Sequence, residues 1–265
     1  MPELPEVETI KNDLTPVVEG RRFVEVEVLN PGSIRHLSPA DFRRGLEGQG
    51  VRQLWRRGKY LIMHLERGDL VVHLMMTGGI FLSPHPTTRA TFLLDSGTRL
   101  HFADRRKLGG LWLVADATQV VGKLGPEPLE PDFTPQVLGE QLWGHKAPIK
   151  ALLLDQSFLA GVGNMYADEA LYTAGIHPLR PGCYLSLKEV ETLHEAIRSV
   201  LLYGIKTGGA SVDTYRRPDG SEGHAHRGFK VAHRRGKECP RCGTPLQRLA
   251  VRQRGTYFCP SCQKE

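Results

Sequence analysis

The sequence predicts an α+β protein with more than one domain: a β-rich N-terminal part, then a helical part and a small metal-bound finger. Three observations lead to this class. Short runs of alternating polar and apolar residues fill most of positions 1–115. Helical spacing of apolar residues dominates from about 136 to 206. Four of the five cysteines fall within the last 27 residues of a 265-residue chain, which favours a metal site over a disulfide framework.

The first predicted element is a helix close to the N-terminus. Apolar side chains recur at three-to-four spacing from Val7 to Val18, acids occupy the first turn, and Gly20 ends the pattern. The period changes to two at Phe23. Many short strands at this spacing predict a β-sandwich or a barrel. The further strand-like runs are 51–56, 59–65, 69–76, 90–94, 98–103 and 111–114.

A stretch rich in proline and glycine separates the two parts of the chain. Six such residues between 115 and 135 break any periodic element. The clearest helix beyond it spans 186–206, where Ser186 and Glu189 form a capping box. Residues 207–237 show little periodicity and are expected to form a loop that could order on a ligand. The predicted domains are a β domain at 1–115, a linker at 116–135, a helical domain at 136–230 and a finger at 231–265.

Charge and composition narrow the class of protein. The chain has 35 Lys and Arg against 29 Asp and Glu, so its formal net charge is +6 at pH 7. A basic balance favours polyanionic partners such as nucleic acid. No run of about 18 apolar residues is present, so no transmembrane helix is predicted. Because the acidic N-terminal residues differ from a secretory signal, we expect a cytoplasmic protein with no membrane association.

Two cysteine pairs form the strongest local motif. The pairs are separated by 16 residues, a spacing typical of one structural Zn²⁺ held by four thiolates. Strand-like residues between the pairs surround a basic turn at Arg254 and Gly255, which predicts a β-hairpin that either binds nucleic acid or serves only as a folding staple. Cys183 lies outside the cluster. The predicted ligands are Cys239, Cys242, Cys259 and Cys262.

The N-terminal Met-Pro sequence is a second candidate for chemistry. A small residue after Met1 permits removal of the methionine, and Pro2 then carries a secondary amine that is partly unprotonated near neutral pH. Such an amine can form an iminium with a sugar carbonyl carbon. The alternative is that Pro2 and Pro5 only start the helix, while the nearby acids complement its dipole.

A third candidate is the run of small residues from 161 to 164, between predicted helices at 150–158 and 166–174. Small residues let a backbone phosphate approach the amides of a helix end, and Asn164 adds a side-chain donor. A tight turn between two helices would have the same composition. Alone, the run does not distinguish the two interpretations.

In combination, these segments resemble the formamidopyrimidine-DNA glycosylase family, also called 8-oxoguanine DNA glycosylase/AP lyase, which is related to endonuclease VIII. The resemblance implies an N-terminal helix on a β-sandwich, a helix–two-turns–helix domain, and a C-terminal zinc-finger β-hairpin with one structural Zn²⁺. The segments that carry it are MPELPEVET at 1–9, RGKY at 57–60, HLMMTG at 73–78, LGPEPL at 124–129, GVGNMYADE at 161–169 and the finger.

The resemblance also implies an activity. It is that of a bifunctional base-excision-repair enzyme that removes 8-oxoguanine and formamidopyrimidines through an N-terminal proline iminium and β,δ-elimination. Pro2 is implied as the nucleophile and Glu3 as the proton donor that helps to open the deoxyribose ring. The implied catalytic residues are Pro2, Glu3, Glu6 and Lys59. The implied DNA-binding residues are His73, Met76, Arg106, Leu108, Lys150, Asn164 and Arg254, and Lys59 is implied to join His73, Lys150, Asn164 and Arg254 in gripping phosphates.

The chain departs from the family pattern in the segments that fill the gap left by the lesion. Leu108 stands where the family has Phe, and it lacks the aromatic face that stacks on a base. Met75 stands where the family has Gly, and Lys107 replaces an Arg. Arg106 keeps the Arg that faces the orphaned base. The loop at 207–237 also departs from the family pattern, because its residues 224–230 are more basic than expected, so the range of lesions is left open.

Two other functions are compatible with these residues. Leu108 allows an endonuclease VIII-like preference for oxidised pyrimidines, and the scaffold alone would suit a non-catalytic protein that binds damaged DNA. The presence of Pro2, Glu3 and Glu6 favours the enzyme, because a pure binder has little need of a terminal amine beside two carboxylates. The expected partner is double-stranded DNA with oxidised bases or abasic sites, and the expected state is a monomer.

Overall fold

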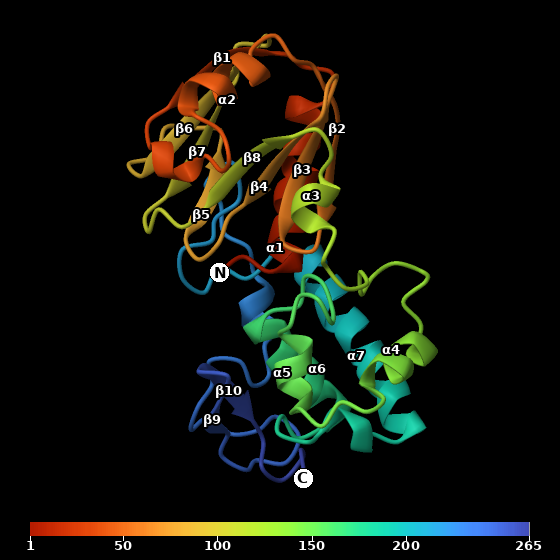
Figure 1. Ribbon diagram of the computed structural model, residues 1–265. Helices are drawn as coiled ribbons and strands as arrows, with labels where there is room; N and C mark the ends of the chain where they lie inside the picture. The colour runs from red at the N-terminus through yellow and green to blue at the C-terminus, as the bar shows by residue number, and fades with distance from the viewer. Residues whose placement is uncertain (265) are drawn as a thin grey trace. The chain divides into compact units, whose positions relative to one another are not determined.

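The computed structural model describes residues 1–264, which divide into two compact units (Figure 1). The β unit comprises residues 1–123 and 207–224. The helical unit comprises residues 124–206 and the chain from 225 onward, including the finger. No helix within residues 1–264 combines the length and the apolar character needed to cross a membrane.

The β unit is a sandwich of two four-stranded antiparallel sheets, preceded by helix α1 (Leu4–Val18). The strand order is β1-β6-β7-β5 in one sheet and β2-β3-β4-β8 in the other. The predicted strand runs are therefore confirmed as a sandwich, with β5 as an extra strand. The strands are β1 (Phe23–Val28), β2 (Val51–Arg57), β3 (Tyr60–Leu65), β4 (Asp69–His73), β5 (Gly78–Phe81), β6 (Thr88–Leu94), β7 (Arg99–Asp104) and β8 (Gly110–Val114).

The core of the β unit explains why these residues fold as they do. Inward-facing residues of both sheets form one buried cluster, and the apolar stripe of α1 from Val7 to Val18 joins it. A helix that the sequence analysis missed, α2 (Pro39–Leu46), adds Phe42 and Leu46 to this core. Its start was readable, since the Ser38 hydroxyl accepts the Asp41 N–H at 3.1 Å.

Two loops cross from one sheet to the other at the same end of the sandwich. Residues 74–77 join β4 to β5, and residues 105–109 join β7 to β8. The register pairs Gly78 with Asp104 and His73 with Gly110, so the two loops lie next to each other. Met75 and Lys107 have φ of 52° and 58°, in the left-handed region that favours glycine.

Residues 207–224 belong to the β unit because they pack against its residues 1–123, from which they are distant in the sequence. Arg217 donates to both carboxylate oxygens of Asp13 on α1, at 2.7 and 2.9 Å. Leu82, after β5, donates its N–H to the Pro218 carbonyl at 2.9 Å. The helical domain proposed at 136–230 therefore differs from the compact helical unit in this segment, because the segment's contacts are long-range.

Up to residue 264, the helical unit contains four α-helices and a two-stranded hairpin. The capping box of α7 (Leu187–Lys206) is confirmed, since the N–H of Ser186 donates to Glu189 at 2.8 Å and the Glu189 N–H donates back to the Ser186 hydroxyl at 3.4 Å. The helix expected over 150–158 is shorter, because Asp155 turns the chain by accepting the Ser157 N–H. The elements are α4 (Pro135–Leu142), α5 (Ile149–Leu153), α6 (Asn164–Ala174), α7 (Leu187–Lys206), β9 (Gln247–Val251) and β10 (Arg254–Phe258); a short α3 (Thr118–Val121) ends the β unit.

The hairpin of the finger is confirmed, but its turn was placed wrongly. Val251 pairs with Arg254, so the turn consists of Arg252 and Gln253, both left-handed with φ of 44° and 61°. The sequence predicted the turn at Arg254 and Gly255 because glycine is favoured in hairpin turns. Gly255 instead lies in β10, where an added Cβ would meet the Arg248 guanidinium at 2.6 Å.

Candidate active site and nucleic-acid interface

The start of α1 brings together the three N-terminal residues predicted to be catalytic. Pro2, Glu3 and Glu6 are all buried. The Glu3 N–H donates to Oε2 of Glu6 at 2.8 Å, which closes the first turn. The other oxygen of Glu6, Oε1, accepts the N–H of Ala210 at 2.8 Å. Glu6 therefore joins the N-terminal segment to residues 207–224 through one carboxylate.

The approach of residues 207–224 to Glu6 depends on a glycine. Gly209 has φ of 81°, and a Cβ there would lie 2.7 Å from the ring of Tyr215 and 3.0 Å from Cγ of Glu6. The Tyr215 hydroxyl donates to the Gly208 carbonyl at 3.1 Å. Burial, followed by the charge of Glu6, raises the pKa of Tyr215 far above its usual range, so it stays a neutral donor.

Lys59 lies in the tight turn between β2 and β3 and is buried. Gly58, before it, has φ of 56°. This turn is tied to α1, because Arg56 at the end of β2 donates Nε to Glu8 at 2.7 Å. Both partners are largely buried, so the pair positions the β2–β3 turn relative to the start of the helix.

His73, at the end of β4, is held as a neutral donor. Its Nδ1 accepts the Met75 N–H at 3.0 Å, so the ring proton is assigned to Nε2. Burial, with a smaller contribution from the charge of Lys59, lowers the pKa of His73 to about 4. The ring packs edge-on against Tyr60, with centroids 4.4 Å apart. A neutral imidazole N–H can donate to a phosphate oxygen without adding a buried charge.

One buried carboxylate organises both sheet-crossing loops. Asp104 is fully buried, and its Oδ2 accepts the N–H groups of Leu108 and Gly109, each at 2.7 Å. Its Oδ1 accepts the Arg106 N–H at 3.1 Å and the hydroxyl of Thr77, in the neighbouring loop. Asp104 therefore fixes the backbone that carries Arg106 and Leu108 and ties it to the loop of Met76.

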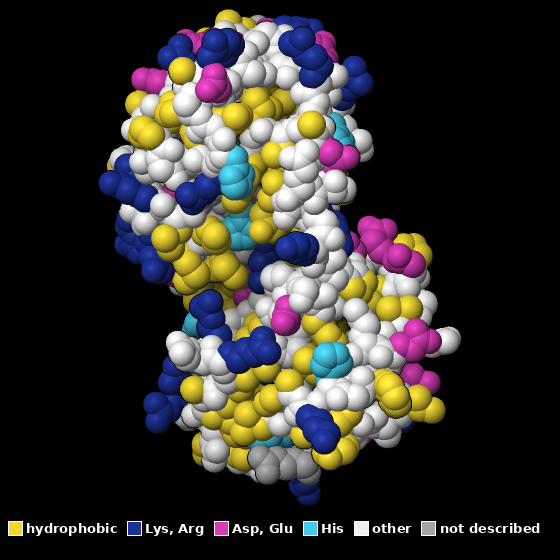
Figure 2. Space-filling view, viewed as in Figure 1, with side chains coloured by type: hydrophobic (Ala, Val, Ile, Leu, Met, Phe, Trp, Pro, Cys, Tyr) yellow, Lys and Arg dark blue, Asp and Glu magenta, His cyan; other side chains and the backbone are white. Residues whose placement is uncertain are grey.

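The side chains on these loops face solvent. Leu108 is 40% exposed and Met75 is 37% exposed, whereas Met76 is half-buried. Residues 105–107 are all exposed cations. Figure 2 shows Lys and Arg side chains gathered along the left edge of the β unit. An apolar side chain beside exposed cations on a fixed loop suits a base stack flanked by phosphates.

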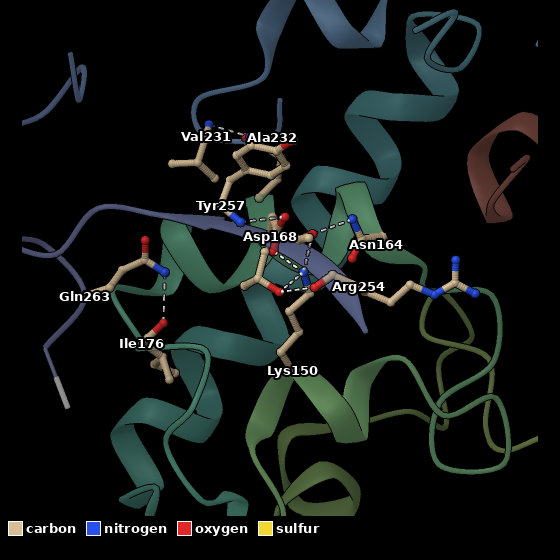
Figure 3. A network of polar contacts seen from close by, with 12 residues as sticks. Lys150, Asn164, Asp168, Ile176, Val231, Ala232, Arg254, Tyr257 and Gln263 are labelled. Carbon is tan, nitrogen blue, oxygen red and sulfur yellow. Dashed lines mark hydrogen bonds and ion pairs between the residues drawn. The ribbon is translucent and has the colours of Figure 1, made fainter. Parts of the chain in front are cut away.

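In the helical unit, a buried ion pair lies under the hairpin (Figure 3). Lys150 on α5 is fully buried, and its Nζ donates to Asp168 on α6 at 2.6 Å and to the Thr256 hydroxyl at 2.8 Å. A longer contact of 3.4 Å reaches the Gly255 carbonyl. The Tyr257 N–H donates to the other Asp168 oxygen at 3.1 Å. The ammonium of Lys150 is thus directed into the protein, which does not support the predicted direct phosphate contact.

Asn164 and Arg254 lie at the edge of this network. The Asn164 amide donates to the Gly255 carbonyl at 2.9 Å, while its buried Oδ1 has no hydrogen-bond partner among residues 1–264. Arg254 is exposed at the start of β10, and Figure 3 shows its guanidinium extending away from Lys150 and Asp168. Lys150 therefore serves to hold the strand that presents Arg254.

The four predicted cysteines form one site. Their sulfur atoms all lie within 4.8 Å of one another, with pairs at 3.5 and 3.8 Å. Four thiolates at about 2.3 Å from a tetrahedral Zn²⁺ would be separated by about 3.8 Å, so the donor set and its spacing suit one structural zinc. The N–H groups of Arg241 and Cys262 point at sulfurs of the two pairs, at 3.4 Å each.

The finger is attached to α6 by another buried carboxylate. Glu169 accepts the consecutive N–H groups of Lys230, Val231 and Ala232 at 2.8–2.9 Å. Arg241 stacks over the Tyr172 ring at 4.4 Å and donates to its carbonyl at 2.9 Å. The segment 161–169 thus has a structural use beyond its glycines, because Asp168 and Glu169 hold the hairpin and the segment before it.

Three family models match consecutive parts of the chain. The formamidopyrimidine-DNA glycosylase N-terminal domain matches residues 1–111, and the formamidopyrimidine-DNA glycosylase H2TH domain matches residues 124–216. The zinc finger found in FPG and IleRS matches residues 236–264. This chain belongs to the formamidopyrimidine-DNA glycosylase family.

Sequence and structure relatives of this glycosylase family agree over the whole chain. The formamidopyrimidine-DNA glycosylase of Symbiobacterium thermophilum is 47% identical, and the alignment covers 99% of this chain and 89% of that protein. The MutM (Fpg) protein of Thermus thermophilus has a TM-score of 0.91 and 42% identity, covering 99% and 98% of the two chains. The wild-type Lactococcus lactis Fpg, in complex with DNA containing an N7-benzyl-Fapy-dG, has a TM-score of 0.92 and 33% identity, covering 100% of both chains.

The structure gives a reason for the departure from the family pattern at Met75. It also shows three structural carboxylates that the sequence analysis did not identify. Met75 occupies a left-handed position, which favours the glycine that the family resemblance implies at this point. Asp104, Asp168 and Glu169 were not singled out, although each holds a predicted interface segment. Their motifs were visible, but a carboxylate that faces inward cannot be distinguished from an exposed one by sequence alone.

Proposed function

We propose that this chain is a bifunctional DNA glycosylase and AP lyase that removes oxidised purines from duplex DNA. The relatives are named formamidopyrimidine-DNA glycosylases, and similar solved structures are complexes with DNA containing Fapy-dG or an abasic site. The observation that carries the mechanism is the placement of Pro2 before two buried carboxylates, with Glu6 held by N–H groups of Glu3 and Ala210.

Base removal begins with the amine of Pro2, freed by loss of Met1. Its lone pair forms a bond to C1′, the C1′–N9 bond breaks, and the purine leaves with the bonding pair and a proton. The nitrogen then forms a C1′=N⁺ iminium as the C1′–O4′ bond breaks, and Glu3 donates a proton to O4′. Glu6 serves as a positioning residue, because both of its oxygens accept backbone N–H groups.

Strand cleavage follows from the electron-withdrawing iminium. The C2′ proton is lost to a base, the resulting enamine expels the 3′-phosphate as the C3′–O bond breaks, and the iminium is conjugated. Loss of the C4′ proton then allows the C5′–O bond to break, which releases the 5′-phosphate. Water hydrolyses the remaining iminium and restores the amine. None of these steps involves the zinc, whose role at the four cysteines is structural.

The remaining site residues hold the DNA in this proposal. Lys59 supplies charge and His73 a neutral Nε2–H to phosphates next to the lesion. Met76, Arg106 and Leu108 fill the space left by the everted nucleotide. Asn164 and Arg254 bind phosphate from the helical unit, whereas Lys150 positions the hairpin. This function implies a DNA-associated, cytoplasmic protein.

Reductive trapping tests the chemistry. Sodium borohydride is added to the protein with duplexes that carry 8-oxoguanine, a formamidopyrimidine, thymine glycol or an abasic site. We expect a covalent adduct on the oxidised purines and the abasic site, with the crosslinked peptide beginning at Pro2. An adduct at another residue, or active protein whose intact mass retains Met1, would overturn the proposal. Preference for thymine glycol would instead identify an endonuclease VIII-like specificity.

Two variants separate catalysis from binding. Pro2→Gly should lower base excision at least a hundredfold while duplex affinity changes less than threefold. Glu3→Gln should stop excision of the damaged base but retain some cleavage of preformed abasic sites, because the abasic substrate needs no base departure. Equal losses of affinity and turnover in both variants would assign these residues a purely structural role.

A further inference from the structure

An apolar groove of about 860 Å³ lies between α4 and α7 in the helical unit. In Figure 1 these two helices lie on the side of this unit opposite to β9 and β10. Trp143 and Leu187 are 85% and 83% exposed, the largest values for big apolar side chains in residues 1–264. The groove is lined by residues that include Gly139, Glu140, Trp143, Leu187, Val190 and Glu191.

The packing of α4 on α7 does not account for this groove. A Cβ at Gly139 would lie 3.7 Å from Cγ1 of Val190, an ordinary contact, and the position has no positive φ. Glycine inside a helix costs about 1 kcal/mol relative to alanine. The fold would therefore accept a Cβ here, and the glycine keeps the floor of the groove open while Trp143 and Leu187 remain in water.

Charge indicates what the groove can bind. Its lining includes Glu140 and Glu191 and no described Lys or Arg. Residues 124–144 contain four acids and no Lys or Arg, in a chain with net charge +6. Lys188 pairs with Glu191 at 3.4 Å, but both side chains are more than half exposed, so the pair is weak. Figure 2 shows acidic side chains along this edge of the helical unit. Nucleic acid and anionic lipid are disfavoured at such a surface.

We propose that this groove binds a basic amphipathic helix of another protein. Its walls are two helices that present residues at i, i+3 and i+4 spacing, the geometry into which a third helix packs. Apolar residues of the partner would fill the space beside Trp143 and above Gly139, and its cations would face Glu140 and Glu191. A symmetric contact between two copies of this chain would bring Glu140 and Glu191 of both copies into one interface with no cation from the groove lining to offset them, which disfavours that occupant.

Synthetic peptides test the proposal with the full-length protein. The probe is a fluorescein-labelled helical peptide of about five turns, with leucines at i, i+3, i+4 and i+7 and lysines and arginines on the other face. Its counterpart has a glutamate at every basic position. We expect saturable binding of the cationic peptide by fluorescence anisotropy, at least tenfold tighter than binding of the anionic peptide.

Variants locate the binding surface. Trp143→Ala, Gly139→Leu, and Glu140→Lys combined with Glu191→Lys should each raise the dissociation constant of the cationic peptide at least tenfold. Gly139→Leu should keep the thermal midpoint, since the added side chain enters the groove. Leu202→Ala is the matched control, because Leu202 is an exposed α7 residue outside the groove, and it should change the constant less than twofold.

Three results would overturn the proposal. These are absence of saturable binding by the cationic peptide, equal binding of the two peptides, and unchanged binding in the Trp143→Ala and Gly139→Leu variants. Sedimentation velocity supplies a fourth: a wild-type dimer that Trp143→Ala converts to a monomer would identify a second copy as the occupant. Lesion excision should be unchanged in all groove variants, so a failure here is distinguishable from a failure of the repair function.

Discussion

The loop at 105–109 presents the exposed Arg106, and the hairpin at 247–258 presents the exposed Arg254. A buried aspartate holds the backbone in each region, but the two aspartates have different partners. The carboxylate of Asp104 accepts neutral donors, which within residues 1–264 are the Thr77 hydroxyl and three backbone N–H groups. Asp168 faces the ammonium of Lys150 at 2.6 Å and accepts one backbone N–H, from Tyr257.

The two aspartates differ in the number of structural elements that their hydrogen bonds and ion pairs connect. The donors to the Asp104 carboxylate belong to two adjacent loops, so loss of this carboxylate should have a local effect. Lys150 and Asp168 connect α5, α6 and β10, and burial raises the pKa of Asp168 to about 7 although Lys150 opposes this shift. Each member of a buried ion pair depends on the other, because a single charge left behind is uncompensated. The hairpin should therefore be the more fragile of the two regions.

Loss of a zinc ligand should have the largest effect, and it should be confined to the helical unit. The hairpin lies between the two cysteine pairs, and for small fingers metal binding supplies the folding free energy. Cys242→Ser should abolish stoichiometric zinc and lower duplex affinity at least tenfold. Cys183→Ser, outside the cluster, is the control and should bind one zinc per chain. Normal affinity in the zinc-free variant would contradict the role given to the hairpin.

Breaking the buried pair should rank next. Lys150→Met leaves the Asp168 carboxylate buried without its cation, and this should cost about 3–5 kcal/mol in the free energy of unfolding. Lys150→Met combined with Asp168→Leu should recover most of that loss, as measured by urea unfolding of the wild type and these two variants. If the double variant were no more stable than Lys150→Met, the loss of stability would be due to packing and not to the uncompensated charge.

Acid should affect the region around the sheet-crossing loops through His73. Its folded pKa of about 4 lies below the ordinary value of 6.5, so the unfolded state binds the proton first as pH falls. The contribution of His73 is present above pH 6.5 and is lost between 6.5 and 4, up to about 3 kcal/mol. His73→Gln should flatten this part of the curve of unfolding free energy against pH. An unchanged slope would show that other groups dominate.

Asp104→Asn should have a smaller, local effect. The amide keeps one acceptor but places an NH₂ against the N–H groups of Leu108 and Gly109, which should cost about 1–3 kcal/mol. Single-turnover excision should fall more than phosphate-dominated binding to undamaged duplex, because the disturbed loop carries Arg106 and Leu108. Equal losses in the two assays would show that Asp104 supports the whole β unit.

The smallest effect on stability should come from changing what the loop presents. Leu108→Phe, at an exposed position, should alter the unfolding free energy by less than about 0.5 kcal/mol. The aromatic face should favour excision of 8-oxoguanine opposite cytosine by about fivefold, since stacking on a base is worth at least about 1 kcal/mol. Leu108→Ala should change it in the opposite direction; a rise with alanine would exclude stacking as the cause.

The sequence predicted those features that depend on local patterns. The stripe of α1, the alternation of the strands, the capping box at Ser186 and the spacing of the four cysteines each arise from residues close together in the chain. The hairpin was also expected, but Arg252 and Gln253 supply its left-handed turn without glycine. The preference of glycine for turns could not reveal this.

Features that depend on contacts between residues far apart in the chain could not be predicted from the sequence. The inward direction of Lys150 requires Asp168 and Thr256, which lie 18 and 106 residues away. The packing of residues 207–224 requires Asp13 and Glu6. A lysine in a DNA-binding family is expected to meet phosphate, and only the fold shows that a carboxylate already faces its ammonium.

The two hydrogen bonds that the Glu6 carboxylate accepts couple the packing of residues 207–224 to the start of α1. The two oxygens of the buried Glu6 carboxylate accept the N–H groups of Glu3, which follows the proposed nucleophile Pro2, and of Ala210. Withdrawal of residues 207–224 would remove the Ala210 N–H from the Glu6 carboxylate, so the packing of this segment and the position of the chain's first residues are thermodynamically linked. Substrate that stabilises the closed segment would thereby also stabilise the geometry of the nucleophile, before any bond is made.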